Sequence, residues 1–202
     1  MKVLVKNFYL FLVFLFAKLI SLFLYDKKYL KNKWFKGQKY FFDAPGWMWI
    51  IRDFNGRLFL HVNNTVPFPI SPFCKVIDFN NINCDPDSIN IFQAPGSYFQ
   101  AYKNGGIIIG RNVWIAPNVG IIATNHDPFD PSKHKEGENV IIEDNCWIGM
   151  NAVILPGVKL GKNTVVGAGS VVTKSFPEGH CVIAGNPAKK IKDLPKEDYQ
   201  ES

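Results

Sequence analysis

Aliphatic residues recur at every sixth position over two stretches of the chain. The first stretch runs from Ile109 to Ile121, and the second begins at Ile142 and ends at Val172. An α-helix turns every 3.6 residues, so a spacing of six would scatter these side chains over different faces of a helix. Short strands that turn a corner once per hexad keep all of them on the inside. The period therefore predicts a β-solenoid. The aliphatic positions are Ile109, Ile115, Ile121, Ile142, Ile148, Ile154, Leu160, Val166 and Val172.

Two further residue types follow the same period and mark the corners of the expected coil. A small or modest side chain stands four residues after the aliphatic position and would fit a crowded corner. Asparagine recurs where a turn has to visit left-handed backbone. The first set is Val113, Val119, Cys146, Ala152, Val158, Thr164 and Ser170, and the asparagines are Asn112, Asn118, Asn145, Asn151 and Asn163.

The region before the hexads is less regular. Leu58–Val62 and Ile89–Phe92 are rich in residues that favour strands, so we expect them to form early, degenerate coils. The chain is accordingly divided into an N-terminal segment (1–39), an irregular entry region with the first degenerate coils (40–108), a regular coil (109–187) and a short C-terminal tail (188–202).

The basic character of the chain is confined to the N-terminal segment. The whole chain has 23 Lys and Arg against 17 Asp and Glu, a net charge of +6 that by itself suggests a polyanionic partner. Residues 1–39 hold nine of the lysines and a single acid, Asp26, so this segment carries +8 and the remainder carries −2. A nucleic-acid partner is therefore not expected for the body of the protein.

Residues 1–39 also contain a long apolar run. From Phe8 to Tyr25 the clearly polar residues are Lys18 and Ser21. A run of this length lies at the short end of what crosses a bilayer as a helix. A small-x-small cleavage site does not follow, which argues against a signal peptide. Six lysines after the run favour the cytoplasmic side for the body. We predict a hydrophobic helix that associates with the cytoplasmic face of a bacterial cell membrane, peripheral or single-pass. Spanning and in-plane insertion remain open, as does packing against the domain end or an oligomer seam.

The four cysteines agree with a reducing compartment. Cys74, Cys84, Cys146 and Cys181 form neither a C-x-x-C pair nor the dense framework of a small secreted domain. We expect four buried, reduced thiols.

Five stretches narrow the solenoid to one family. They are Ile115–Val119, Asn145–Gly149, Ile154–Val158, Gly167–Lys174 and Ala184–Lys189. With the hexads, they resemble the hexapeptide-repeat acyltransferases, in the branch that contains maltose, galactoside and polysaccharide O-acetyltransferases. The resemblance implies an all-β fold, a left-handed parallel β-helix with three hexads per turn. It also implies acetyl-CoA as co-substrate and a homotrimer whose sites are shared between subunits.

The period breaks once, between Ile121 and Ile142. These residues are 21 positions apart, three more than a whole number of hexads, so an excursion leaves the coil. Pro128, Pro131 and Gly137 mark residues 124–139 as a loop. An insertion that the coil does not require is a better indication of function than a core position.

His126 stands at the start of this loop, where the resembling acyltransferases have a catalytic His. A sugar hydroxyl is a weak acid, so a base that works near neutrality must take its proton as it attacks a thioester. We predict that His126 is this general base and that the acetyl group moves directly, without an acyl-enzyme. Asn125 or Asp127 is expected to orient the imidazole.

The resemblance also suggests binding residues. Trp147 would pack against acetyl-CoA, backbone N–H groups near Gly149 and Met150 would hold the oxyanion, and the three residues Ala168, Thr173 and Lys174 would contact the pantetheine and adenine ends. Lys189 and Lys192 stand where relatives often have Arg near the nucleotide phosphates. The acceptor is expected at Tyr98, Gln100 and Tyr102.

A metal site is not predicted. The loop residues His126, Asp127, Asp130 and His134 could form a metal cluster, and the γ-class carbonic anhydrases bind zinc on this fold. Those enzymes carry a close second His pair, about five residues apart, that this chain lacks. The favoured function is O-acetylation of a saccharide in surface polysaccharide or glycolipid biosynthesis. The alternatives are N-acetylation of a nucleotide-linked amino sugar or an antibiotic, and a non-enzymatic β-helix scaffold.

Overall fold

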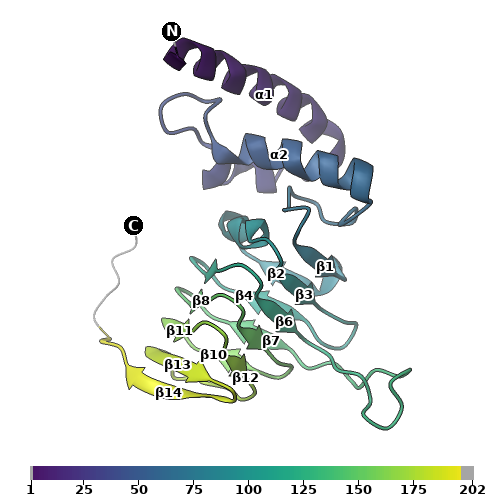
Figure 1. The fold of residues 1–202 in the computed structure, drawn as a ribbon, viewed down its shortest axis with the longest axis vertical. Helices are drawn as coiled ribbons and strands as arrows, with labels where there is room; N and C mark the ends of the chain where they lie inside the picture. Colours follow the sequence, from purple (N-terminus) through teal and green to yellow (C-terminus); the bar gives the residue numbers. More distant parts are fainter. Residues whose placement is uncertain (1, 197–202) are drawn as a thin grey trace.

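The computed structural model describes residues 2–196 as a coil of short parallel strands with a helical layer at one end. Helix α1 (Lys2–Leu24) is outermost, and α2 (Pro45–Asn55) lies between it and the coil (Figure 1). Short helical turns link these parts. They are η1 (Tyr29–Lys31), η2 (Lys33–Phe35), η3 (Gly56–Leu60), η4 (Phe79–Asn81) and η5 (Pro86–Gln93).

The described strands form three sheets that the chain visits in rotation. Sheet 1 contains β1 (Lys75–Ile77), β3 (Tyr98–Gln100), β6 (Gly120–Ile122), β9 (Val153–Ile154) and β12 (Val171–Val172). Sheet 2 contains β2 (Ile82–Cys84), β4 (Ile107–Ile109), β7 (Val140–Ile142) and β10 (Lys159–Leu160). Sheet 3 contains β5 (Trp114–Ile115), β8 (Trp147–Ile148), β11 (Thr164–Val166), β13 (Cys181–Gly185) and β14 (Ala188–Asp193). Pairing is parallel except that β14 runs antiparallel to β13.

The hexad aliphatics stack on one another inside the coil, as their period predicts. Ile109 pairs with Ile142 in sheet 2, and Ile121 pairs with Ile154 in sheet 1. The nine positions are buried, except that Ile115 is partly buried against the same core. The residues four positions later are all buried as well. Because a parallel ladder places equivalent residues at the same height, one side chain per hexad fills each wall of the interior.

The recurring asparagines make the corners. All five have positive φ, between 54° and 61°. This is the left-handed region, which Asn adopts more readily than most residues. The corner prediction is therefore confirmed. The positions are Asn112, Asn118, Asn145, Asn151 and Asn163.

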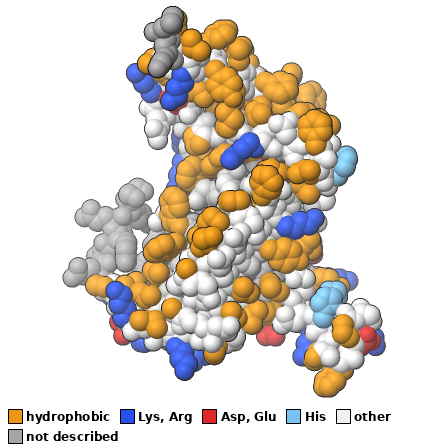
Figure 2. Space-filling view, viewed as in Figure 1, with side chains coloured by type: hydrophobic (Ala, Val, Ile, Leu, Met, Phe, Trp, Pro, Cys, Tyr) orange, Lys and Arg blue, Asp and Glu red, His pale blue; other side chains and the backbone are white. Residues whose placement is uncertain are grey.

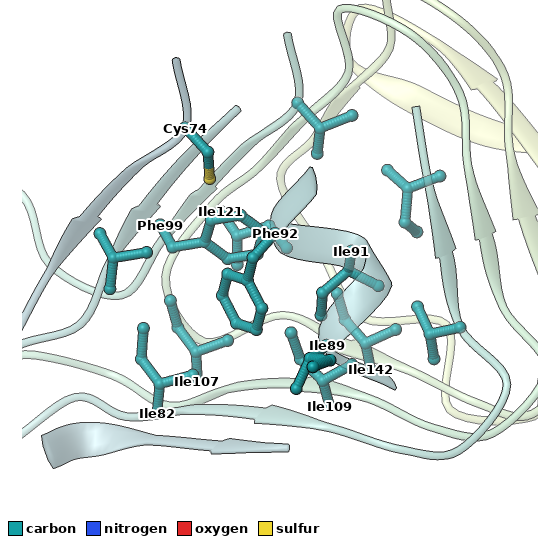
Figure 3. Close-up of a cluster of buried hydrophobic side chains, with 14 of the residues drawn as sticks. Cys74, Ile82, Ile89, Ile91, Phe92, Phe99, Ile107, Ile109, Ile121 and Ile142 are labelled. Atoms are coloured by element: carbon teal, nitrogen blue, oxygen red, sulfur yellow. The ribbon is translucent and has the colours of Figure 1, made fainter. Parts of the chain in front are cut away.

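The first coil is completed by a helical turn rather than a strand. Asp85 caps η5 by accepting a hydrogen bond from the Asp87 N–H, and Pro86 occupies the first turn, where its fixed φ suits a helix. The strand predicted over Ile89–Phe92 is therefore wrong. The residues still serve the core: Figure 3 shows Ile89, Ile91 and Phe92 among the inward side chains of the first coils.

The strand predicted over Leu58–Val62 is also wrong. Backbone hydrogen bonding continues from α2 into the π-helical turn η3, and the Arg57 Nε donates to the Asp53 carboxylate at 2.8 Å, which closes this turn. Because α1, α2 and these turns are helical, the predicted all-β fold describes the coil alone. The coil itself is confirmed as parallel and three-sided; its left-handed winding stays a prediction.

Two predicted boundaries fall inside elements of the structure. β4 crosses from the entry region (40–108) into the regular coil (109–187), and regular pairing already begins at β1. β14 contains the first residues of the predicted tail (188–202), of which 197–202 lie outside the described residues.

Candidate functional site

The excursion predicted from the broken period is a narrow hairpin that leaves the coil after β6 and returns at β7 (Figure 1). Its two arms are joined by backbone hydrogen bonds. The Asp127 N–H donates to the Lys133 carbonyl and the Lys135 N–H to the Asn125 carbonyl, both at 2.8 Å. The hairpin therefore presents its side chains on a defined backbone, beside the corner between sheets 1 and 2.

His126 is exposed on the first arm, and one of its ring nitrogens is already engaged. Its Nδ1 lies 2.7 Å from the carbonyl oxygen of Pro131, across the loop. A carbonyl only accepts hydrogen bonds, so Nδ1 must carry the proton and donate. The neutral ring then has its lone pair on Nε2, which makes Nε2 the basic atom that an acceptor hydroxyl would meet.

An aromatic column stands beside His126. The ring of His134, on the return arm, has its centroid 4.2 Å from that of His126, and the two residues form an antiparallel bridge. The Tyr102 ring stacks on the other side of His134 at 5.2 Å with an interplanar angle of 12°. The ring of His134 thus links the predicted base, His126, to Tyr102, which was predicted to contact the acceptor.

The predicted orienting residues are not the hydrogen-bond partners of the imidazole. The Asp127 carboxylate accepts from the Phe129 N–H at 2.8 Å, which shapes the loop, and Asn125 contributes its backbone carbonyl to the hairpin. The group that orients His126 is the Pro131 carbonyl. Sequence reasoning missed it because any residue supplies a carbonyl; the loop length alone hinted that the chain folds back here.

Tyr98 and Gln100 flank the buried Phe99 in β3 and are half-buried on the outer face of sheet 1. In register they stand beside Gly120 and Ile122 of β6, the strand that leads into the hairpin. They therefore lie along the approach to His126, whereas Tyr102 lies beyond the strand end, at the column.

Five of the residues predicted to bind acetyl-CoA lie at two edges of sheet 1, and the other three lie on sheet 3. Gly149, Met150 and Ala168 occupy the corner that leads from sheet 3 into sheet 1, before β9 and β12. A Cβ on Gly149 would come within 2.7 Å of the Val166 carbonyl oxygen and the Ala168 nitrogen. Only glycine therefore lets successive corners stack this closely. Thr173 follows β12 on the opposite edge, the edge from which the hairpin departs.

Trp147 lies on the outer face of sheet 3, directly opposite Trp114 of the neighbouring strand β5. The two indoles are 55% and 53% exposed. Such exposure is unusually high for tryptophan. Sequence reasoning singled out Trp147 and missed Trp114; the signal was available, since both precede a hexad aliphatic (Ile148 and Ile115) by one residue.

The three predicted basic contacts are separated from one another. Lys189 and Lys192 are exposed on β14, opposite Ala184 and Val182, while Lys174 follows β12 at the far edge of sheet 1 with its Nζ 5.9 Å from the centre of the Phe176 ring. Lys189 lies in the same column as the Gly149 corner but three strands away from it: Gly149 stacks on the Gly167–Ala168 corner, Gly167 stacks on Ala184, and Ala184 pairs with Lys189.

The cysteines are reduced thiols. Burial raises the pKa of the Cys146 thiol to about 12. This side chain therefore stays protonated at neutral pH and is a poor nucleophile. Cys84 is half-buried, and the other three thiols are buried. Within residues 2–196, His, Cys, Asp and Glu side chains do not form a group of three or more that would hold a metal ion.

The coil is similar in sequence to known transferases. Residues 139–174 match the family model described as bacterial transferase hexapeptide (six repeats). Galactoside O-acetyltransferase of Escherichia coli K12 is 44% identical over 96 residues, which is 46% of this chain and 46% of that protein. A 2,3,4,5-tetrahydropyridine-2,6-dicarboxylate N-acetyltransferase of Clostridium perfringens SM101 is 61% identical over 54 residues, 27% of this chain and 22% of that protein.

A solved galactoside acetyltransferase in complex with coenzyme A is 34% identical, with a TM-score of 0.44, over 50% of this chain and 56% of that one. The chain spans about half the length, or less, of the curated relatives named above. The hexads, the corners and these matches show that residues 139–174 are hexapeptide repeats of the bacterial transferase type, and that about half of the chain is similar in sequence to hexapeptide-repeat acetyltransferases.

Proposed function

We propose that this protein transfers the acetyl group of acetyl-CoA to a hydroxyl of a saccharide. The observation that carries the proposal is the state of His126: its Nδ1 donates to the Pro131 carbonyl, so an exposed Nε2 is left as a base beside an aromatic column. The relative named for galactoside O-acetylation supports a sugar acceptor. The faces of Tyr102 and His134 offer a surface on which a sugar ring can stack.

In the proposed reaction, Nε2 of His126 takes the proton of the acceptor hydroxyl while the hydroxyl oxygen attacks the acetyl carbonyl carbon. The carbonyl oxygen becomes an oxyanion, and a backbone N–H is needed to hold it. The Gly149 N–H already donates to the Val166 carbonyl at 2.8 Å, which leaves the Met150 N–H at the same corner for this role. When the C–S bond breaks, the proton on His126 passes to the sulfur of the leaving thiolate. Acetyl-CoA supplies the activated acetyl group.

The residues at the Gly149 corner fit the co-substrate. Met150 is exposed at this corner, and Trp147, three positions earlier in the chain, is exposed on the adjoining face of sheet 3. Lys189 and Lys192 on β14 supply positive charge for phosphates in a body that carries −2 overall. The corner and the hairpin lie on opposite edges of sheet 1 in one chain. A homotrimer in which the corner of one subunit faces the hairpin of the next would join them, and we include this in the proposal.

N-acetylation is the second candidate. Its specific support is the clostridial N-acetyltransferase, which is 61% identical to this chain over 54 residues. The galactoside enzyme is 44% identical over 96 residues. A base at His126 would serve an amine or a hydroxyl acceptor. We favour the hydroxyl because the galactoside relative matches a longer part of the chain. We further propose that the acceptor is a saccharide of surface polysaccharide or glycolipid biosynthesis.

The test is release of free CoA from acetyl-CoA, measured with galactoside and maltoside acceptors and with an amino-sugar nucleotide. His126→Ala should lower turnover of the preferred acceptor by about 100- to 10,000-fold. Lys135→Ala, an exposed change in the same hairpin, is the matched control and should leave turnover within about twofold. Turnover of an amine alone would favour the second candidate. Equal rates for the parent and His126→Ala would refute the role of His126 as the general base. Failure to bind acetyl-CoA would favour the alternative of a non-enzymatic scaffold.

A further inference from the structure

The outer face of α1 is a continuous apolar surface that residues 2–196 leave uncovered. Nine side chains form this face, and all nine are apolar and between 48% and 80% exposed. At its border, the Phe16 ring also meets the Phe54 ring of α2 edge to face at 6.2 Å. At 3.6 residues per turn the nine side chains occupy roughly a third of the helix circumference. Figure 2 shows hydrophobic side chains gathered over this end of the molecule. The nine are Leu4, Val5, Phe8, Leu12, Leu15, Phe16, Leu19, Leu22 and Phe23.

The inner face of the same helix is packed and mostly apolar, with Lys18 over the Trp47 ring and the buried Ser21 as its polar residues. The Phe14 ring lies 4.9 Å from the Trp47 ring of α2, and Ala17 and Ile20 are buried. A helix that is apolar all round belongs in a protein core or in lipid. Since α1 has core on one side only, its other side is built for a second apolar environment.

The packing also decides how α1 can enter a bilayer. From Phe11 onward the helix is flanked by protein: the Phe11 ring lies 5.8 Å from that of Phe42, whose loop (36–43) carries exposed lysines and the carboxylate of Asp43. Phe42 also lines a pocket with Leu4, Val5 and Phe8, so this loop lies along the N-terminal part of α1 as well. A hydrocarbon core is about 30 Å thick, so α1 cannot span it without drawing charged groups into lipid.

The C-terminal end of α1 is tied to the body by a buried network. The Tyr25 hydroxyl donates to the Asp53 carboxylate at 2.7 Å, and the Arg57 guanidinium, bonded to the same carboxylate, also donates to the Val66 carbonyl at 2.7 Å. These bonds join α1, α2 and the entry to the coil. They hold α1 against α2 rather than leaving it free to swing out as an independent span.

A second apolar element and a basic one surround this end of the molecule. Leu58, Phe59 and Leu60 of η3 are exposed directly after Arg57. Six exposed lysines lie in the connection between α1 and α2, where lipid headgroups would be met. They are Lys27, Lys28, Lys31, Lys33, Lys36 and Lys39.

We propose that α1, together with Leu58–Leu60, lies in the plane of one leaflet of an anionic phospholipid bilayer and docks the coil there as a monotopic protein. Apolar area supplies the insertion, and the lysines supply attraction to anionic headgroups and the choice of membrane. The surface is independent of the proposed transferase chemistry, so either proposal can fail without the other.

Flotation of the purified full-length chain with vesicles tests the docking. We expect binding to phosphatidylcholine vesicles that contain phosphatidylglycerol, and weaker binding without it. Leu12→Glu with Leu19→Glu, on the outer face, should lower the partition coefficient on the order of 100-fold. Lys27→Gln with Lys31→Gln should lower it roughly tenfold or more, and only for the anionic vesicles.

Ile191→Glu is the matched control, since Ile191 is 63% exposed on β14, against 48% for Leu12 and 55% for Leu19. It should leave vesicle binding unchanged. Binding that survives the two glutamates on α1 would overturn the proposal. A parent chain that does not bind vesicles and instead self-associates through α1 would also overturn the proposal.

Thiol labelling separates in-plane insertion from spanning. In the vesicle-bound Lys6→Cys variant, a membrane-impermeant maleimide should react with the new thiol as fast as it does in detergent. The labelling of the parent chain is subtracted as background. An in-plane helix leaves this position on the outer surface. Protection of the thiol until the vesicles are lysed would show that α1 spans and would overturn the in-plane geometry.

Discussion

The Nδ1 atom of His126 donates at 2.7 Å to the carbonyl oxygen of Pro131, five positions later in the chain. The bond selects one imidazole tautomer without using a carboxylate. It predicts that the neutral ring carries its proton on Nδ1. Nitrogen-15 NMR of the labelled protein should therefore give His126 a protonated Nδ1 and an unprotonated Nε2. The reverse assignment would show that the loop does not hold the ring in this way.

His134 is predicted to act as a positioning residue through its ring. It lies between His126 and Tyr102, so His134→Ala removes the middle of the column and should lower kcat/KM about tenfold, mainly through KM for the acceptor. His134→Phe keeps an aromatic ring and should recover most of the loss. If both variants lose kcat equally, His134 takes part in proton transfer instead.

Asp53 predicts a specific pH dependence of stability. Burial raises the pKa of this carboxyl to about 6, more than the Arg57 charge and the hydrogen bonds from Tyr25 and Arg57 lower it. A carboxyl with a raised native pKa contributes most below its unfolded pKa, and the contribution is lost as pH rises through about 6. The free energy of unfolding of the parent, relative to Asp53→Asn, should therefore increase as pH falls from 6 to 4. The opposite slope would mean that Arg57 outweighs burial.

Neighbouring residues of β7 test the hexad interpretation. Ile142 is fully buried, so Ile142→Ala should lower the free energy of unfolding by about 2–5 kcal/mol in chemical denaturation. Ile141, one residue earlier, points outward and is half-buried. Ile141→Ala should cost less than about 1 kcal/mol. Equal losses would contradict the register.

The corner asparagines predict a backbone effect. Asn151 has φ of 60° and is exposed. Asn151→Ala should destabilise by about 1–2 kcal/mol because a Cβ without a local hydrogen-bonding group strains this conformation. Asn151→Gly should stay close to the parent. Thermal unfolding of the pair measures the difference, and a glycine variant as unstable as the alanine variant would point to a side-chain contact instead.

The sequence by itself determined the coil. A period of six specifies which residue of each hexad is buried and where the corners fall, because the rule is local and repeats; the spacing alone places Ile148 inside and Asn145 at a corner. The same reasoning located the hairpin, since an insertion of three residues cannot stay in register. It also placed His126 within the hairpin.

Only the tertiary structure decided the contacts that join distant or irregular parts. The partner of His126 is a main-chain carbonyl, which leaves no trace in the sequence, and the column with Tyr102 depends on how the hairpin folds back. The strand-like composition of Leu58–Leu60 was overridden because the helix of α2 continues here and Arg57 is held in place, by an i,i+4 ion pair with Asp53 and by tertiary hydrogen bonds to the Val66 and Phe68 carbonyls. The apolar run of α1 was plain in the sequence. That one side of it is core and the other is bare followed only from its packing on α2.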